Sequence, residues 1–334
     1  MYVPFKQMSA CIAVLAALTG CTLIDEDTSD CVSHYRVEYR LQLGLETRPS
    51  DEVNKVLKGS SDVAAATALL DYMGNIFSDV AHDLDLSFYD VVADSVRLHQ
   101  EQHLVEADRA TYAINIAAHR YMHLATANLR DNAVAVLRMD DRCRRSRFVL
   151  ERTDTVASQR TGLFTTRLPM ELLADQDQEF STVLYMANSG IALVADTLDS
   201  HIRDLDVFAS GFADGFNICD STFRYGSNPV VRTDRLDLSS PGEMCFAAIT
   251  FPSPDVPLTR AGEAACWEFR TVATLPDGSR TQTILAMPDP LPAGGIKVLK
   301  VKVLDDGSVT PADTKVGVSV TLDWSTGYSG EIPL

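Results

Sequence analysis

Residues 34–46, HYRVEYRLQLGLE, alternate between apolar and polar side chains. The aromatic and aliphatic residues occupy the odd positions from Tyr35 to Leu45, and charged or polar residues occupy nearly all of the even ones. A period of two is typical of a β-strand that is buried on one face and exposed on the other. We therefore predict that the folded part of the chain begins with a strand that faces a single core.

Similar runs predict more strands along the rest of the chain. Short apolar or alternating segments lie at 84–90, 112–118, 134–137, 180–186 and 191–195. In the last third, runs at 267–274 and 281–287 flank a Pro-Asp-Gly turn, and runs at 297–303 and 316–324 flank an Asp-Asp-Gly turn. Glycine accepts the positive φ that such turns require, so each pair predicts a hairpin or a neighbouring strand. In the final run, the residues expected on one face are Val316, Val318, Val320, Leu322 and Trp324.

One segment has a helical pattern instead. After a polar stretch at 47–61, for which we predict no element, Asp62 precedes apolar residues at steps of three and four as far as Leu84. These steps predict a helix that packs against a core, although Gly74 in its middle costs up to about 1 kcal/mol. The end of this segment gives way to the strand at 84–90.

Many short strands with regular turns favour sandwiches over α/β layers. The 334 residues are enough for two domains. We predict a mainly β protein with two β-sandwich domains in tandem, at 34–165 and 166–334, and a minor helical segment in the first. The net charge of −17 argues against a nucleic-acid partner and against attachment to an anionic membrane by charge.

The N-terminus has the features of an export signal. Residues 10–18, ACIAVLAAL, are nine consecutive residues without a polar side chain, too short to span a bilayer, which needs about 20. They are followed by Leu18-Thr19-Gly20-Cys21, which resembles the bacterial lipobox. We predict a signal peptide at 1–20, cleavage between Gly20 and Cys21, acylation (palmitate) of Cys21 and an acidic tether at 21–33. The alternative is an ordinary secretory signal followed by a chance cysteine.

Five further cysteines would remain after cleavage. An oxidising compartment allows disulfides, but five is an odd number, so at least one thiol stays unpaired or pairs between chains. The sequence leaves the pairing open among Cys31, Cys143, Cys219, Cys245 and Cys266.

No catalytic or metal-binding pattern is found. His119 and His123, like His99 and His103, are spaced four apart, but no His-Glu-x-x-His motif or third ligand accompanies them. Residues 211–216, GFADGF, are interpreted as a turn with apolar anchors rather than a phosphate-binding loop. We expect no enzyme activity, no cofactor and no metal.

Four segments are distinctive when taken together. They are Cys21-x9-Cys31 with its acidic spacer, residues 77–90 with their ending LDLSFYD, residues 210–216 (SGFADGF) and residues 318–324 (VSVTLDW). Together they resemble the FimB type of fimbrial anchor and accessory lipoproteins of Bacteroidetes. The resemblance implies two transthyretin-like, Greek-key sandwiches, a lipid anchor in the outer membrane, and a place at the base or tip of a fimbria whose pilin subunits join by strand exchange. Segment 47–70 departs from the family by being longer.

The family's stalk subunits are cut after an arginine, which frees them from lipid. Here no Arg or Lys lies between Cys21 and Arg36, and Arg36 is already inside the first predicted strand. This favours an anchor that keeps its lipid over a stalk subunit, while a tip or stalk subunit is kept as one alternative and the sequence leaves the position at the base or the tip open. A second alternative is a surface glycan-binding lipoprotein, which would need an exposed aromatic platform. The two tryptophans of this chain, Trp267 and Trp324, instead fall where strand periodicity places core residues.

Overall fold

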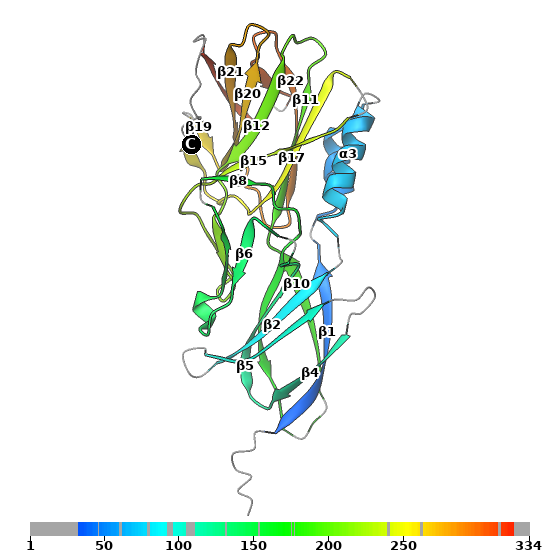
Figure 1. Ribbon diagram of the computed structural model, residues 1–334, viewed down its shortest axis with the longest axis vertical. Helices are drawn as coiled ribbons and strands as arrows, with labels where there is room; N and C mark the ends of the chain where they lie inside the picture. The colour runs from blue at the N-terminus through cyan, green and yellow to red at the C-terminus, as the bar shows by residue number, and fades with distance from the viewer. Residues whose placement is uncertain are drawn as a thin grey trace, which may run out of the picture.

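The computed structural model describes residues 33–323 apart from 46, 60–61, 79–80, 92–95, 105–110, 131, 153, 175, 177, 239–240, 261–262 and 313–314. The chain forms an elongated, mainly β molecule (Figure 1). The described strands make a seven-stranded, a six-stranded, a five-stranded and a four-stranded sheet, together with a small two-stranded hairpin, β18–β19. No helix in the described part of the chain is long and apolar enough to cross a membrane.

The seven-stranded sheet fills the lower half of the molecule in Figure 1. Its order is β3-β2-β5-β9-β10-β1-β4. The bounds are β1 His34–Gly44, β2 Asp83–Asp90, β3 Arg97–Leu104, β4 Thr111–Ala117, β5 Arg120–Ala127, β9 Phe164–Glu171 and β10 Gln178–Met186. The predicted first strand is confirmed, with Val37 and Tyr39 buried and Arg36, Glu38 and Arg40 exposed.

A five-stranded sheet forms the central layer of the upper half, in the order β16-β17-β11-β22-β23. The bounds are β11 Ser189–Asp196, β16 Asp234–Leu236, β17 Glu243–Thr250, β22 Ile296–Val303 and β23 Val309–Pro311. Nearly every residue of β11 is buried, because both faces of this sheet are covered. A continuous apolar run is what a strand buried on both faces requires.

The six-stranded sheet covers one of those faces, in the order β24-β21-β20-β12-β15-β8. The bounds are β8 Thr155–Ala157, β12 Asp204–Ser210, β15 Val230–Arg232, β20 Trp267–Thr274, β21 Arg280–Met287 and β24 Gly317–Asp323. The hairpin predicted around Gly278 is confirmed as β20–β21. The core between the two sheets includes Leu193, Phe246, Trp267, Phe269 and Leu285.

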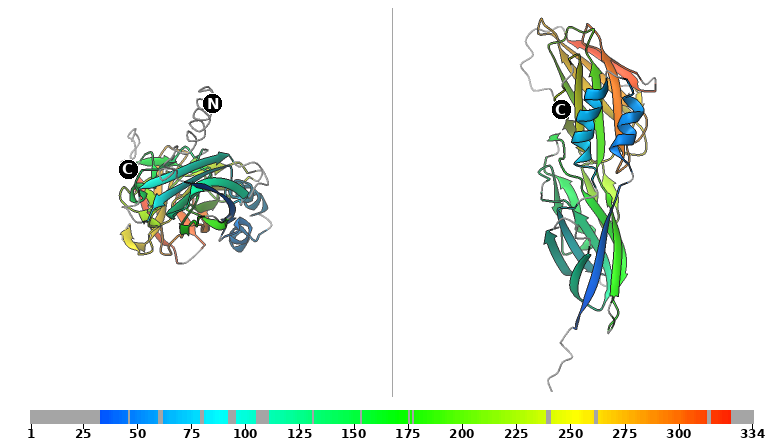
Figure 2. Two further views of the ribbon diagram at one scale, coloured as in Figure 1. Left: turned by 90° about the horizontal axis from the view of Figure 1, so that it is seen from below. Right: turned by 90° about the vertical axis from the view of Figure 1, so that its right-hand side faces the viewer.

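Two helices cover the other face of the five-stranded sheet, side by side in Figure 2 (right). α2 is Pro49–Val56 and α3 is Val63–Gly74. Val53, Ala65, Leu69 and Met73 are buried in one cluster with residues of β11, β17 and β22. The helical segment is therefore early in the sequence but packs on strands that all follow residue 188.

The helix prediction needs two corrections. The structure ends α3 at Gly74, not near Leu84, and the N–H groups of Ile76 and Phe77 both donate to the carbonyl of Met73 in the closing turn. The stretch at 47–61 contains α2, where we expected no element. Pro49 at the first turn, acidic residues after it and Lys55 in the last turn are the start and stop signals that identify this helix.

The four-stranded sheet joins the two halves of the sequence, in the order β14-β13-β7-β6. The bounds are β6 Ala135–Arg138, β7 Arg147–Leu150, β13 Gly215–Asn217 and β14 Thr222–Arg224. The domain boundary expected after residue 165 falls inside β9, and the chain leaves the seven-stranded sheet only after Met186. β8, which precedes residue 165, pairs with β15, and β13, which follows residue 165, pairs with β7. Strands from both sides of the expected boundary therefore share sheets.

Candidate functional site

The six-stranded sheet ends at β24, which pairs antiparallel with β21. Among the described residues β21 is its only strand neighbour, so the outer row of β24 backbone groups has no partner strand there. Such an edge can accept another strand through main-chain hydrogen bonds.

The side chains of this edge strand make it unusual. Val318 is opposite Leu285, and Val320 is opposite Thr283. Residues opposite each other in an antiparallel pair point to the same face, so both valines lie on the face that carries the buried Leu285 and Thr283. Leu285 and Thr283 are fully buried, whereas Val318 and Val320 are 41% and 44% exposed. The interior-facing side of the sheet is therefore uncovered at β24.

The facing sheet explains this exposure. Its last described strand, β23, lies over β21, where the N–H of Val309 donates to Oγ1 of Thr283 at 3.1 Å. No strand in the described part of that sheet lies beyond β23, so nothing from it covers β24. The result is an apolar strip beside an open sheet edge, with alternate side chains available to a partner strand.

Two turns of identical sequence, Asp-Gly-Ser, lead into β21 and β23. Oδ1 of Asp277 accepts hydrogen bonds from the backbone and side chain of Ser279, and Asp306 accepts the same two bonds from Ser308. These bonds hold the pKa of both aspartates below its usual range, the serine hydroxyl being the main cause. Gly278 and Gly307 take φ values of +87° and +79°, which glycine adopts without strain. The turns fix β21 beside β20 and β23 beside β22.

The first strand, β1, is not at an edge. It pairs in parallel with β10 and antiparallel with β4, so it lies inside the seven-stranded sheet. Arg36 is opposite Asn115 in the middle of the β4 pairing. A protease would have to extract this strand before it could cut after Arg36.

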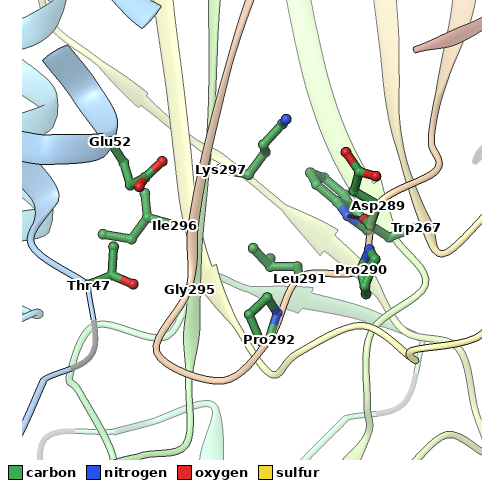
Figure 3. A pocket seen from close by; sticks show the side chains of 10 residues that line it. All are labelled: Thr47, Glu52, Trp267, Asp289, Pro290, Leu291, Pro292, Gly295, Ile296 and Lys297. Carbon is green, nitrogen blue, oxygen red and sulfur yellow. Dashed lines mark hydrogen bonds between the residues drawn. The ribbon is translucent and has the colours of Figure 1, made fainter. Parts of the chain in front are cut away.

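A cavity of about 300 Å³ lies between α2, the loop after β21 and the start of β22 (Figure 3). Glu52, Asp289 and Lys297 supply charged groups, and two prolines and one leucine from the loop supply apolar ones. Trp267 contributes to the lining but is 1% exposed, and its Nε1–H donates to the carbonyl of Asp289 at 3.1 Å. The indole therefore cannot act as a stacking platform for a sugar ring.

The predicted histidine pairs have structural partners. His123 is fully buried: its Nδ1 donates to the carbonyl of Ser87 at 3.1 Å, and its Nε2 accepts from the Tyr39 hydroxyl at 2.7 Å. His99 and His103 each contact one oxygen of Glu101 on β3. His119 lies 3.2 Å from Asp90. Within the described ranges, no group of three or more His, Cys, Asp or Glu side chains is arranged to hold a metal ion.

The remaining predicted residues divide into described and undescribed ones. Gly20, Cys21, Cys31 and Trp324 lie outside the described residues, as does the tether up to residue 32. Phe212 and Phe216 of the 211–216 segment are buried, as expected of apolar anchors, but Gly215 and Phe216 belong to strand β13 and not to a turn. Cys143, Cys245 and Cys266 are buried and Cys219 is partly exposed. Sequence periodicity placed Val318 and Val320 on a core-facing side but gave no signal that this side is uncovered.

Neither a protein-family model nor a curated protein matches this sequence. Solved structures do share its fold. A protein of Bacteroides ovatus described as a candidate adhesin aligns with a TM-score of 0.52 and 9% identity, over 90% of this chain and 97% of its own. A protein of Bacteroides thetaiotaomicron described as a candidate polysaccharide-binding protein aligns with a TM-score of 0.52 and 10% identity, over 84% and 99%. These two alignments show a shared fold.

A third structure is the fimbrial anchor protein Mfa2 from Porphyromonas gingivalis. It aligns with a TM-score of 0.47 and 9% identity, over 86% of this chain and 98% of its own.

Proposed function

We propose that this protein is a cell-surface fimbrial subunit that joins other subunits by β-strand addition at the outer edge of β24. The observation that carries the proposal is the exposure of Val318 and Val320 on the interior-facing side of an edge strand. A partner strand would gain main-chain hydrogen bonds along the edge and would bury alternate apolar side chains over the two valines. Each Å² of apolar surface that is buried would favour this association by about 25 cal/mol.

Two further observations support a role in adhesion. The fold is shared with a protein described as a candidate adhesin from Bacteroides ovatus. The sequence also resembles the fimbrial anchor and accessory lipoproteins through residues 77–90, 210–216 and 318–324. Neither observation involves catalysis, so we propose a binding protein rather than an enzyme.

Within this function we propose the permanent, lipid-bound anchor, held in the outer membrane through acyl chains on Cys21. The inward position of β1 supports it, because removal of the chain up to Arg36 would take away residues paired with β4. Each buried CH₂ of a lipid chain contributes about 0.8 kcal/mol, and several chains on one cysteine hold firmly.

The strand-addition proposal can be tested by photo-crosslinking in cells that make the protein. A benzophenone amino acid is placed at Val318, and the matched control carries it at Val256, which is 70% exposed elsewhere on the surface. We expect position 318 to crosslink to a fimbrial subunit and position 256 not to do so. The same partners at both positions, or no pilin at position 318, would overturn the proposal.

The anchor proposal needs a separate measurement, the mass of the mature N-terminal peptide from membrane fractions of wild type and Cys21→Ala. An acylated N-terminal Cys21 that is lost in the variant is expected. A mature chain that begins at or after Arg36 would instead make the protein a polymerising stalk subunit. A surface glycan-binding protein, the other alternative, would be retarded in gels that contain the polysaccharide, whereas an anchor would not.

A further inference from the structure

Two cysteines meet where the four-stranded sheet joins the halves of the chain. Cys143 begins the short 3-10 helix η3, Cys143–Arg145, which leads directly into β7. Cys219 follows β13 by two residues. β7 and β13 are antiparallel neighbours, with Arg147 opposite Asn217. The chain therefore enters one strand and leaves the other at the same end of the sheet.

The backbone holds these two ends together beyond the strands themselves. The N–H of Ile218 donates to the carbonyl of Ser146 at 3.1 Å, and the N–H of Ser146 donates to the carbonyl of Cys143 at 3.0 Å. Cys143 is fully buried in the core cluster against which Cys219 also packs. The side chain of Cys219 contacts the Cys143 thiol; burial, and then this contact, raise the pKa of the Cys143 thiol.

The other described cysteines have different surroundings. Cys245 faces the helix-covered side of the five-stranded sheet, in a different cluster from Cys143. The Sγ of Cys266 lies 3.3 Å from the carbonyl oxygen of Pro288. The sequence left the disulfide pairing open among five cysteines. The positions of η3 and β13 favour the pair Cys143 and Cys219.

We propose that Cys143 and Cys219 form a disulfide that joins η3 to the end of β13. The bond would close a chain segment that includes β8 to β12, and it would fix the four-stranded sheet across the two halves of the molecule. This inference does not depend on the proposed fimbrial function.

The chemistry is thiol–disulfide exchange with a disulfide-bearing oxidant, such as oxidised glutathione or a thiol oxidase of the exporting compartment. Cys219 is the more exposed thiol, so its thiolate attacks one sulfur of the oxidant and releases the other as a thiolate. The Cys143 thiol then loses its proton and attacks Sγ of Cys219, which releases the second oxidant thiolate. Two protein thiols are oxidised, and one oxidant disulfide is reduced to two thiols.

The test uses the full chain, purified with its thiols reduced and then equilibrated with oxidised glutathione. Free thiols are alkylated, and peptides are mapped by mass spectrometry without reduction. We expect a linked peptide pair that contains Cys143 and Cys219 and is two hydrogens lighter than the sum of its parts. In Cys219→Ser this pair should be absent. The proposal would be overturned if folded, glutathione-treated protein were alkylated at both Cys143 and Cys219, or if Cys143 were linked to another cysteine.

A second measurement compares thermal stability with and without reductant. Reductant should lower the Tm of the oxidised wild-type chain by about 5 °C or more, because the bond closes a long segment of the unfolded chain. The Cys219→Ser chain provides the control, whose Tm should not change with reductant. An oxidised wild-type Tm that is equally insensitive would contradict the disulfide.

Discussion

Val318 lies directly opposite Leu285 on the same face of the six-stranded sheet, yet Leu285 is fully buried and Val318 is 41% exposed. The burial of the sheet interior therefore ends between two neighbouring strands. Leu285→Ala should lower the free energy of unfolding by about 2–5 kcal/mol, since it leaves a cavity in the core. Val318→Ala should cost less than about 1 kcal/mol. Urea denaturation of both variants measures the difference, and equal losses would contradict an open edge.

The buried His123 predicts a dependence of stability on pH. Burial lowers the pKa of His123 from 6.5 to about 4. Between these values the unfolded chain binds a proton that the folded chain does not, so stability falls as pH falls from 6.5 to 4. The loss from this group reaches about 3 kcal/mol.

The free energy of unfolding in urea is measured for wild type and His123→Gln across that pH range. The difference between the two chains separates the contribution of His123 from that of carboxylates that titrate in the same range. A histidine NMR titration midpoint near 6.5 for His123 in the folded protein would contradict it.

An ion pair with a buried carboxylate and a partly exposed lysine fixes the start of α3 to the five-stranded sheet. Lys300 on β22 contacts Asp62, whose side chain is 5% exposed. Lys300→Met should destabilise the fold by about 3 kcal/mol, because it leaves a buried carboxylate without its cation. Lys302→Met, on the same strand, is the matched control: its pair with Asp199 is exposed and should matter little. Thermal unfolding compares the two.

The stability lost in Lys300→Met should depend on pH. Burial raises the pKa of Glu243, and the nearby Asp62 and Asp196 raise it while Lys300 lowers it. Removing Lys300 raises this pKa further, so the stability lost in Lys300→Met should shrink as pH falls and Glu243 takes up a proton. A loss that stays constant from pH 7 to pH 4 would show that the charge cluster is not responsible.

The two Asp-Gly-Ser turns provide a matched pair of glycine substitutions. Both glycines have positive φ, so replacement by alanine costs roughly 1–2 kcal/mol at either turn. A Cβ at Gly278 would meet open space, whereas at Gly307 it would lie 3.0 Å from Cβ of Ala273 and 3.1 Å from Cβ of Thr281. Gly307→Ala should therefore be the more destabilising change in urea denaturation. Equal effects would mean that the neighbouring strands yield easily.

The sequence predicted individual strands and turns better than it predicted which distant segments pair or pack together. The alternation in β1 and the Pro-Asp-Gly turn are local signals, and the structure confirms the strand and the hairpin that they predict. The pairing expected across the Asp-Asp-Gly turn is wrong: β22 turns into the short strand β23, and the run at 316–324 forms β24, which pairs with β21 in the other sheet. The parallel pairing of β1 with β10 joins residues far apart in the chain, and no local pattern encodes it. The packing of α2 and α3 on β11, β17 and β22 is likewise set by which apolar surface is left to cover.

The candidate site was accessible from the sequence only in part. Periodicity correctly placed Val318 and Val320 on one face with an interior orientation, because that depends on the strand alone. Their exposure depends on where the facing sheet stops, at β23, which is a property of the whole fold. Cys143 and Cys219 could not be matched for the same reason, since β7 and β13 come from opposite halves of the chain.

The position of β1 has a mechanical consequence. This strand lies along the long axis of the molecule in Figure 2 (right), flanked by β10 on one side and β4 on the other. A pull on its N-terminal end along that axis would load the hydrogen bonds on both sides together, in shear, instead of opening them one after another. Many bonds would have to break at once, so the strand that follows the predicted tether is placed where it can resist traction.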